Sequence, residues 1–234
     1  MKLRVFMYHK LGHQADFLTV TPEQFEQQMQ FIRKHFTPIR LSDLIQHLEH
    51  QSPLPEKAAL ITFDDGYENN YLLAYPILKK HQMPFAVFLV ADYIGKEVAH
   101  DQQMQRFMSQ HHLQNMQDWA EYGCHSTKHQ NINDIAVEEW YNEIENCHQS
   151  LQQQGITIQP AWAYTYGAFP RKNPDSFAQL KHIFQNAGIC CAFRIGNRIN
   201  NLPIKNPYTI ERIDVRGDQS YWRFKLKAIW GKLF

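Results

Sequence analysis

Two adjacent carboxylates, Asp64 and Asp65, follow an apolar run and are the side chains of this sequence best placed to do chemistry. The run, residues 58–63, is short and partly β-branched and aromatic, so it predicts a buried strand. Gly66 breaks the run and puts both carboxylates where a strand gives way to a loop. A buried pair of like charges is costly unless a cation holds it. The pattern therefore favours a metal or acid–base site over a simple Asp-Gly turn.

Two histidines four residues apart, His125 and His129, could meet these carboxylates. This spacing can place two imidazoles on one metal ion. Among 13 histidines such a pair also arises by chance, and His9 with His13 is a second instance. However, His125 follows a predicted strand, and in a parallel α/β barrel the carboxyl ends of the strands share one rim. The sequence thus predicts a divalent metal on one aspartate, His125 and His129, with the other aspartate as a base, and the spacing does not choose between the two.

The elements that must position these residues alternate along the chain. We predict strands over residues 3–8, 38–41, 58–63, 85–90, 122–125, 162–164, 190–194 and 210–215. We predict helices over residues 22–35, 42–48, 69–81, 137–154 and 174–187, one or two short ones within 91–120, and one at the C-terminus. Thr21, Ser42 and Asn69 or Asn70 are the expected helix caps. This alternation predicts an α/β fold, a distorted (β/α) barrel of seven or eight parallel strands.

Composition limits the function and the compartment. A net charge of +1 argues against a nucleic-acid-binding protein and favours a small or neutral partner. The apolar stretch over residues 5–8 is too short for a signal-peptide core, and no 18-residue apolar run is present. Four cysteines without CxxC spacing fit reduced thiols in the cytoplasm.

The C-terminal segment has a pattern of its own. After Asp218 the chain has four cations and no acid, with an apolar stripe at helical spacing: Trp222, Leu226, Ile229, Trp230 and Leu233. This pattern predicts a helix that either lies on an anionic membrane surface or closes the bottom of the barrel. We therefore expect a catalytic barrel over residues 1–218 and a basic amphipathic helix over 219–234.

Three motifs in this order resemble the polysaccharide deacetylase family, the NodB-homology carbohydrate esterases: TFDDG at 62–66, HSTKH at 125–129 and WAYTYG at 162–167. The resemblance runs from residue 8 to about residue 214. It implies the distorted barrel of that family, with Asp64 as the general base. It also implies a metal on Asp65, His125 and His129, with zinc as the first expectation and cobalt or nickel as alternatives.

The third motif departs from the family pattern, because it lacks the arginine that usually orients the base. Tyr166 and Gly167 remain, and the resemblance implies that the Tyr166 backbone N–H stabilises the oxyanion. The aromatic residues Tyr67, Trp162 and Tyr164 are candidates for stacking on sugar rings.

The departure resembles the deacetylases of poly-β-1,6-N-acetylglucosamine and related enzymes. That subgroup implies His9, after the first strand, as the general acid. Arg212 and Asp214 are candidates for orienting neighbouring groups and no more.

The expected function is metal-dependent removal of acetyl groups from N-acetylhexosamine residues. The expected partner is an N-acetylated glycan or glycolipid precursor of the bacterial surface, such as a lipopolysaccharide or lipooligosaccharide core or an exopolysaccharide. The expected place is the cytoplasm, peripherally at an anionic inner-membrane surface. Two alternatives stay open: a catalytically impaired carbohydrate-binding relative, and a hydrolase of a non-sugar amide on the same fold. The sequence indicates no oligomeric state.

Overall fold

Seven parallel strands close into a barrel in the computed structural model, which describes residues 1–100 and 103–231. The order around the barrel is β1-β13-β11-β10-β9-β6-β5, and β5 pairs with β1 along its length, from Lys2 opposite Lys57 to Tyr8 opposite Phe63. The strands are β1 (Lys2–Tyr8), β5 (Lys57–Asp65), β6 (Phe85–Leu89), β9 (Ala120–Cys124), β10 (Ile158–Ala163), β11 (Cys191–Ile195) and β13 (Ile210–Asp214). The predicted (β/α) barrel is confirmed, with seven strands.

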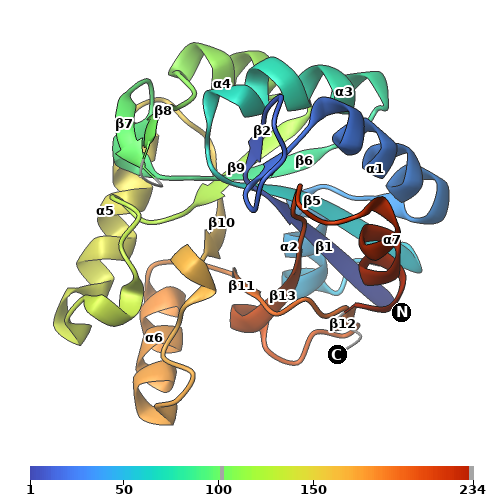
Figure 1. Cartoon of the computed structure of the whole chain (residues 1–234). Coiled ribbons are helices and arrows are strands. Elements are labelled where there is room, and N and C mark those ends of the chain that lie inside the picture. The colour runs from blue at the N-terminus through green and yellow to red at the C-terminus, as the bar shows by residue number, and fades with distance from the viewer. Residues whose placement is uncertain (101–102, 232–234) are drawn as a thin grey trace.

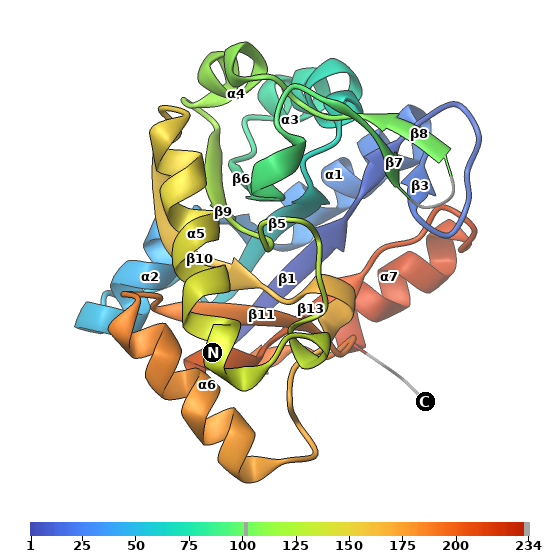
Figure 2. The same ribbon diagram turned by 90° about the vertical axis from the view of Figure 1, so that its left-hand side faces the viewer.

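Helices surround this barrel (Figures 1 and 2). They are α1 (Pro22–His35), α2 (Leu41–His50), α3 (Tyr75–Lys80), α4 (Gln110–Met116), α5 (Trp140–Gln153), α6 (Pro174–Asn186) and α7 (Tyr221–Trp230). A π-helical turn, Asn70–Ala74, precedes α3. The short strands are β2 (Lys10–Leu11), β3 (Thr19–Val20), β4 (Thr37–Pro38), β7 (Glu97–His100), β8 (Gln103–Arg106) and β12 (Asn200–Asn201). Within the described chain, no helix has the length and apolarity that crossing a membrane requires.

Two apolar layers hold the barrel together, because successive side chains of a strand face opposite sides. Leu3 and Val5 of β1 belong to the layer inside the barrel, whereas Phe6 and Tyr8 belong to the layer beneath the helices. Three residues of α2 join the inner layer: Leu41, Leu44 and Ile45. Since β4, just before α2, pairs with the first residues of β5, α2 closes the end of the barrel where the strands begin.

The C-terminal helix packs on the outside of the barrel beside α1, so it does not close the barrel bottom, which was one of the two predicted alternatives. Phe224 and Ala228 of α7 are buried, and the Phe224 ring lies 5.9 Å from the Phe31 ring of α1. Part of the predicted apolar stripe faces away from this contact: Trp222 is 63% exposed and Trp230 is 67% exposed, whereas Leu226 is half-buried. Leu233 lies outside the described residues, and a domain boundary at residue 218 stays a prediction.

The asparagines before α3 do not cap the helix, contrary to the prediction. The Asn69 side-chain oxygen accepts the Leu11 backbone N–H at 3.0 Å. The Asn70 side-chain amide donates to the His9 carbonyl at 2.8 Å. Both side chains thus fix the segment after β1, which carries His9, against the segment after β5.

Of the two other predicted helix N-caps, one is confirmed and one is wrong. The capping box at Thr21 is confirmed, since its hydroxyl accepts the Gln24 N–H at 3.2 Å and the Gln24 side chain accepts the Thr21 N–H at 3.0 Å. The cap at Ser42 is wrong, because α2 begins one residue earlier and the N-cap is Arg40. Residues 91–120 contain α4, as expected, and also the unpredicted β7–β8 hairpin.

Candidate active site

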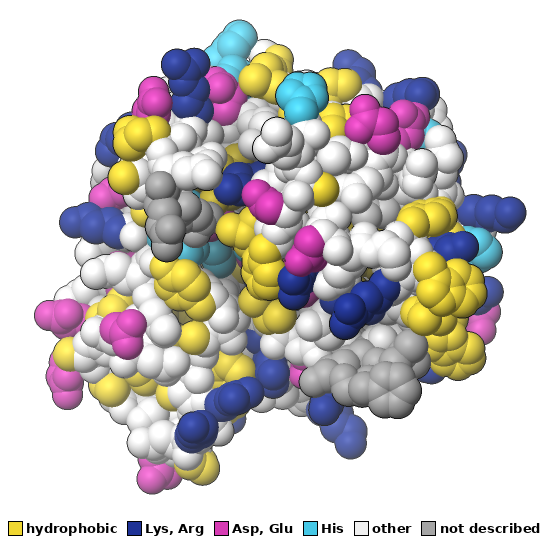
Figure 3. Space-filling model, viewed as in Figure 1, with side chains coloured by type: hydrophobic (Ala, Val, Ile, Leu, Met, Phe, Trp, Pro, Cys, Tyr) yellow, Lys and Arg dark blue, Asp and Glu magenta, His cyan; other side chains and the backbone are white. Residues whose placement is uncertain are grey.

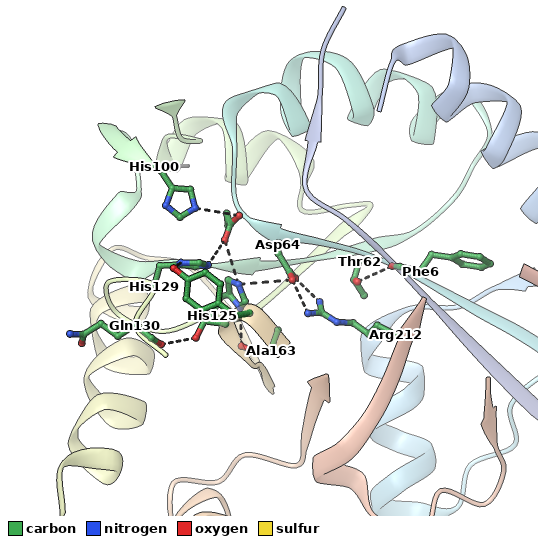
Figure 4. A network of polar contacts seen from close by, with 12 residues as sticks. Phe6, Thr62, Asp64, His100, His125, His129, Gln130, Ala163 and Arg212 are labelled. Atoms are coloured by element: carbon green, nitrogen blue, oxygen red, sulfur yellow. Dashed lines mark hydrogen bonds and ion pairs between the residues drawn. The ribbon is translucent and has the colours of Figure 1, made fainter. Parts of the chain in front are cut away.

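The predicted carboxylates and histidines meet at one rim of the barrel (Figure 4). Asp64 and Asp65 end β5, and His125 directly follows β9, with only β6 between these strands. Because the strands run parallel, their carboxyl ends share this rim. The Nε2 atoms of His125 and His129 lie 3.4 Å and 3.2 Å from Oδ1 of Asp65. Both aspartates are only 2% exposed, so a buried acidic pair faces two imidazoles.

Several residues at this rim have strained backbone conformations. Four non-glycine residues there have a positive φ angle: Asp65 (70°), Ser126 (75°), His129 (59°) and Tyr166 (56°). Such conformations cost about 1–3 kcal/mol each and persist where the surrounding structure enforces them, commonly at functional sites. At Asp65 the turn of the backbone ends the strand and lets two adjacent carboxylates line one cavity.

Hydrogen bonds on Nδ1 orient both histidines. The Nδ1 of His125 lies 2.8 Å from the Ala163 carbonyl, which can only accept, so Nδ1 carries a proton and Nε2 is the nitrogen that faces Asp65. The Nδ1 of His129 lies 3.1 Å from the Tyr166 hydroxyl. Metal-binding histidines are held in this way, with the second nitrogen on a carbonyl or another polar partner.

Arg212 of β13 holds Asp64 through two parallel hydrogen bonds (Figure 4). Its Nη1 and Nη2 atoms donate to Oδ1 and Oδ2 of Asp64 at 2.5 Å and 2.7 Å, and the arginine side chain is fully buried. Asp64 was not predicted as the partner of Arg212. The available signal was its place in an apolar strand, two residues after the inward-facing Ile210.

The charges around the pair keep both carboxyl groups ionised. Burial alone would raise the pKa of Asp64, but the charges of Arg212 and His125 outweigh burial and lower it. Burial would likewise raise the pKa of Asp65, and the surrounding histidines lower it well below the usual value. Arg212 pairs with Asp64 alone, so the buried Asp65 carboxylate can still accommodate a further positive charge.

The residues present fit a divalent metal ion. Oδ1 of Asp65 is buried and has no hydrogen-bond partner among the described residues. Imidazole nitrogen and carboxylate oxygen are the donor set that suits zinc, and imidazole also suits nickel and related ions. A third histidine, His100 at the end of β7, places a ligand atom within 4.8 Å of those of Asp65 and His129. His100 was not predicted as a site residue, because nothing in its spacing separates it from the other histidines of a polar segment.

His9 lines the same cavity, which has a volume of about 390 Å³. Asp214 of β13, which pairs with Met7 of β1, also lines the cavity, and burial raises the pKa of this carboxyl group. His13 is exposed and is not among the described residues that line the cavity, so the structure does not support His9 and His13 as a metal-binding pair.

Tyr166 and Gly167 also lie at the cavity. The Thr165 hydroxyl donates to the Gln130 carbonyl at 2.6 Å and so fixes this turn against the loop of His129 (Figure 4). Gly167 has φ of 63°, and a Cβ atom there would lie 2.8 Å from the Ile195 side chain, so the turn requires glycine.

Three aromatic residues expected to contact sugar lie in the core instead. Tyr67, Trp162 and Tyr164 are at most 2% exposed. The Tyr164 hydroxyl donates to the Tyr208 carbonyl at 3.1 Å, so its side chain has a packing role and the predicted substrate contact is wrong. The exposed aromatic residues at the cavity are Phe17 (53%) and Tyr166 (65%).

Comparisons with solved structures show the same fold. Streptococcus pyogenes deacetylase PplD in complex with acetate superposes with a TM-score of 0.80 at 18% identity, covering 97% of this chain and 98% of that one. IcaB from Ammonifex degensii gives a TM-score of 0.80 at 20% identity, covering 98% and 96% of the two chains. At these identities the likeness concerns the fold alone, which is that of a NodB-type (β/α) barrel.

Comparisons of sequence identify the family. The Bacillus subtilis protein YxkH, whose own assignment as a polysaccharide deacetylase is provisional, is 31% identical over 178 residues; the match covers 70% of this chain and only 58% of that protein. The poly-β-1,6-N-acetyl-D-glucosamine N-deacetylase of Staphylococcus aureus is 25% identical over 210 residues, covering 86% of this chain and 69% of that protein. The family model for polysaccharide deacetylases matches residues 51–182, which include both aspartates and both motif histidines. The chain therefore belongs to the polysaccharide deacetylase family.

Proposed function

We propose that this protein is a metal-dependent hydrolase that removes acetyl groups from N-acetylhexosamine residues of a glycan or glycolipid. The observation that carries the proposal is the cavity in which Asp64, held by Arg212, adjoins the cluster of Asp65, His125 and His129. Family membership supports an N-deacetylase, since the family consists of carbohydrate esterases that hydrolyse N-acetyl amide bonds.

Asp65, His125 and His129 would hold the ion. When bound, a divalent ion polarises the acetamide carbonyl and lowers the pKa of a bound water toward about 7. His125 and His129 offer Nε2 for this purpose, because their Nδ1 atoms are engaged by Ala163 and Tyr166.

Asp64 is the general base. It takes a proton from the water that attacks the acetamide carbon. Arg212 keeps it ionised and fixes its plane, and each carboxylate oxygen retains a second lone pair to receive the proton.

His9 is the general acid. An amide nitrogen leaves poorly unless it is protonated, and His9 lies in the same cavity to donate that proton. Its position is fixed by the Asn70 side chain, which binds the His9 carbonyl. The backbone N–H of Tyr166 is assigned to the developing oxyanion.

The absence of an arginine from the third motif does not make this chain a catalytically impaired relative. Arg212 makes the paired hydrogen bonds to the base that the third motif cannot supply. Hydrolysis of a non-sugar amide remains the enzymatic alternative and is an outcome of the test below.

The substrate contacts follow from the exposed aromatic residues. Phe17 and Tyr166 flank the cavity and can stack on sugar faces in place of the buried aromatics. We propose that the substrate is a bacterial exopolysaccharide or a lipopolysaccharide-type glycolipid. The name of the S. aureus relative supports the exopolysaccharide.

Acetate release from a panel of N-acetylated substrates tests this function. The panel contains β-1,6-linked N-acetylglucosamine oligomers, N-acetylated glycolipid cores and Nε-acetyl-lysine peptides. We expect release from at least one sugar substrate, its loss with a chelator, and its loss in Asp64→Asn. Release from the peptide alone, or sugar deacetylation that Asp64→Asn leaves unchanged, would overturn the proposal.

The exposed face of α7 supports contact with an anionic membrane. Trp222 and Trp230 are exposed, with Lys225 lying 5.0 Å above the Trp222 ring and Arg223 exposed beside it. Figure 3 shows hydrophobic side chains gathered at the position of α7, with basic side chains nearby. Apolar rings with flanking cations are typical of interfacial helices.

Liposome flotation tests this contact. At low salt the intact protein should be found in the top fraction with vesicles of phosphatidylglycerol and phosphatidylethanolamine. A Trp222→Ser, Trp230→Ser double variant should remain in the bottom fraction. Leu72→Ser, at another exposed apolar side chain (54%), is the matched control. Equal flotation of the double variant and the wild type contradicts the proposal. The placement in the cytoplasm stays a prediction.

A further inference from the structure

The β7–β8 hairpin carries a third histidine to the rim of the barrel. It lies in the connection between β6 and β9, and its strands pair antiparallel from Glu97 opposite Arg106 to His100 opposite Gln103. Its base is fixed to the acidic motif, because the Met108 N–H donates to the carbonyl of Gly66 at 2.9 Å. The segment that presents His100 is thereby anchored one residue after Asp65.

An aromatic enclosure fixes the His100 ring. The ring centroids of Tyr67, Tyr93 and Phe107 lie 6.0 Å, 5.4 Å and 5.9 Å from that of His100. The side chain is 8% exposed, so the imidazole is held inside the protein beside the acidic pair.

The distances around His100 fit ligation better than a hydrogen bond. Its Nε2 lies 3.7 Å from Oδ2 of Asp65, which is too long for a hydrogen bond. Two atoms that each lie about 2.1 Å from a shared ion are at most about 4.2 Å apart, so this separation suits two ligands of one metal. The ligand atoms of Asp65, His100 and His129 all lie within 4.8 Å of one another. His125 is not in this group, but its Nε2 lies 3.4 Å from Oδ1 of the same carboxylate.

Asp65 divides its two oxygens between these histidines. Oδ1 faces His125 and His129, whereas Oδ2 faces His100 (Figure 4). The His100 and His129 rings meet edge to face with centroids 4.7 Å apart, so their nitrogens converge on the same carboxylate.

We propose that His100 is a fourth protein ligand of the divalent ion held by Asp65, His125 and His129. The inference rests on the metal dependence of the proposed function and goes beyond the ligand set given above. Four protein ligands would fill a tetrahedral site, so a catalytic water would need a fifth position on the ion.

The first test measures metal binding without turnover. Cobalt-loaded wild type, His100→Gln and His129→Gln are compared by visible absorption and by competition with a chelator. His111→Gln, an exposed histidine of α4 in the same connection, is the matched control. We expect His100→Gln to change the cobalt spectrum and to weaken binding by more than the tenfold to hundredfold that loss of an outer-sphere partner costs, as His129→Gln does. Thermal unfolding of the metal-free proteins checks that each variant is folded.

A second measurement uses the wild-type protein, so it tests the inference even if the His100→Gln variant does not fold. In protein loaded with cadmium-113 and labelled with nitrogen-15 histidine, scalar coupling between the metal and imidazole nitrogens counts the histidine ligands. Three coupled histidines are expected. Two coupled histidines, or an unchanged cobalt spectrum in a folded His100→Gln variant, would overturn the inference.

The two proposals fail separately. A wild type that binds metal and deacetylates sugar, while His100→Gln keeps the wild-type spectrum and affinity, refutes only the role of His100. A wild type that binds no divalent metal refutes the proposed function itself.

Discussion

Replacement of Arg212 by methionine should destabilise the protein, because it leaves Asp64 buried without its paired cation. Asp64 is 2% exposed and Arg212 is fully buried, so water cannot replace the two hydrogen bonds at 2.5 Å and 2.7 Å. Removing one partner of a buried ion pair costs about 3–5 kcal/mol of unfolding free energy. Methionine has an unbranched apolar side chain, like the stem of arginine, so the decrease in unfolding free energy reports mainly on the lost charge.

The pH dependence of that loss has a definite sign. In the wild type the pKa of Asp64 is lowered by Arg212 despite burial, so its contribution to stability is present above the unfolded pKa and is lost as the pH falls through the folded value. Without Arg212, burial becomes the dominant influence and raises the pKa of Asp64. The stability deficit of Arg212→Met should therefore grow toward neutral pH and shrink in acid.

Urea unfolding of the metal-free proteins at several pH values measures this effect. The control is Arg194→Met, because Arg194 makes a partly exposed ion pair with Glu211 at 3.5 Å and should contribute about 0–1 kcal/mol. Activity should fall about a hundredfold in Arg212→Met through misplacement of the base. Arg212→Lys should restore part of the stability but less of the activity, since an ammonium cannot make the paired contact. A deficit below about 1 kcal/mol at neutral pH, like that of the control, would refute the reasoning.

Three further substitutions test other parts of the structure. Asp64→Asn should keep bound metal, measured by elemental analysis, and lose about a hundredfold to ten-thousandfold in kcat; wild-type turnover would remove Asp64 as the base. His9→Ala should lower kcat and remove the alkaline limb of the pH–rate profile, whereas His13→Ala should leave both unchanged; equal profiles would contradict the acid role. Gly123→Ala should cost about 1–3 kcal/mol in urea unfolding, because a Cβ atom there would lie 2.6 Å from the Phe88 ring, and an unchanged midpoint would show that the barrel interior can adjust.

Local patterns in the sequence were sufficient for most of the fold. The apolar run before Asp64, the Thr21 capping box and the alternation of strands and helices depend on neighbouring residues, so a single pass along the chain reveals them. The shared rim followed from one further rule, that parallel strands present their carboxyl ends together. That rule was enough to bring the carboxylates and His125 to one cavity.

The errors arose where a polar residue had a partner far along the chain. Asn69 and Ser42 have the right residue type for a helix cap, but the Asn69 side chain binds the Leu11 N–H, 58 residues away, and α2 begins before Ser42. Tyr164 resembled a rim residue because its neighbours are at the rim, yet its ring is buried against Phe169 and against Phe184 of α6.

The sequence by itself determined the kind of chemistry, since residue types fix it: two carboxylates, two histidines and the strands that carry them. The tertiary structure alone decided which groups support them. Arg212 is 148 residues from Asp64, and its charge reaches the base only because β13 lies beside β1 in the closed barrel. His100 reaches Asp65 only because the hairpin is anchored to Gly66. Contacts of this kind depend on the closure of the barrel and on side-chain direction, and no local pattern encodes either.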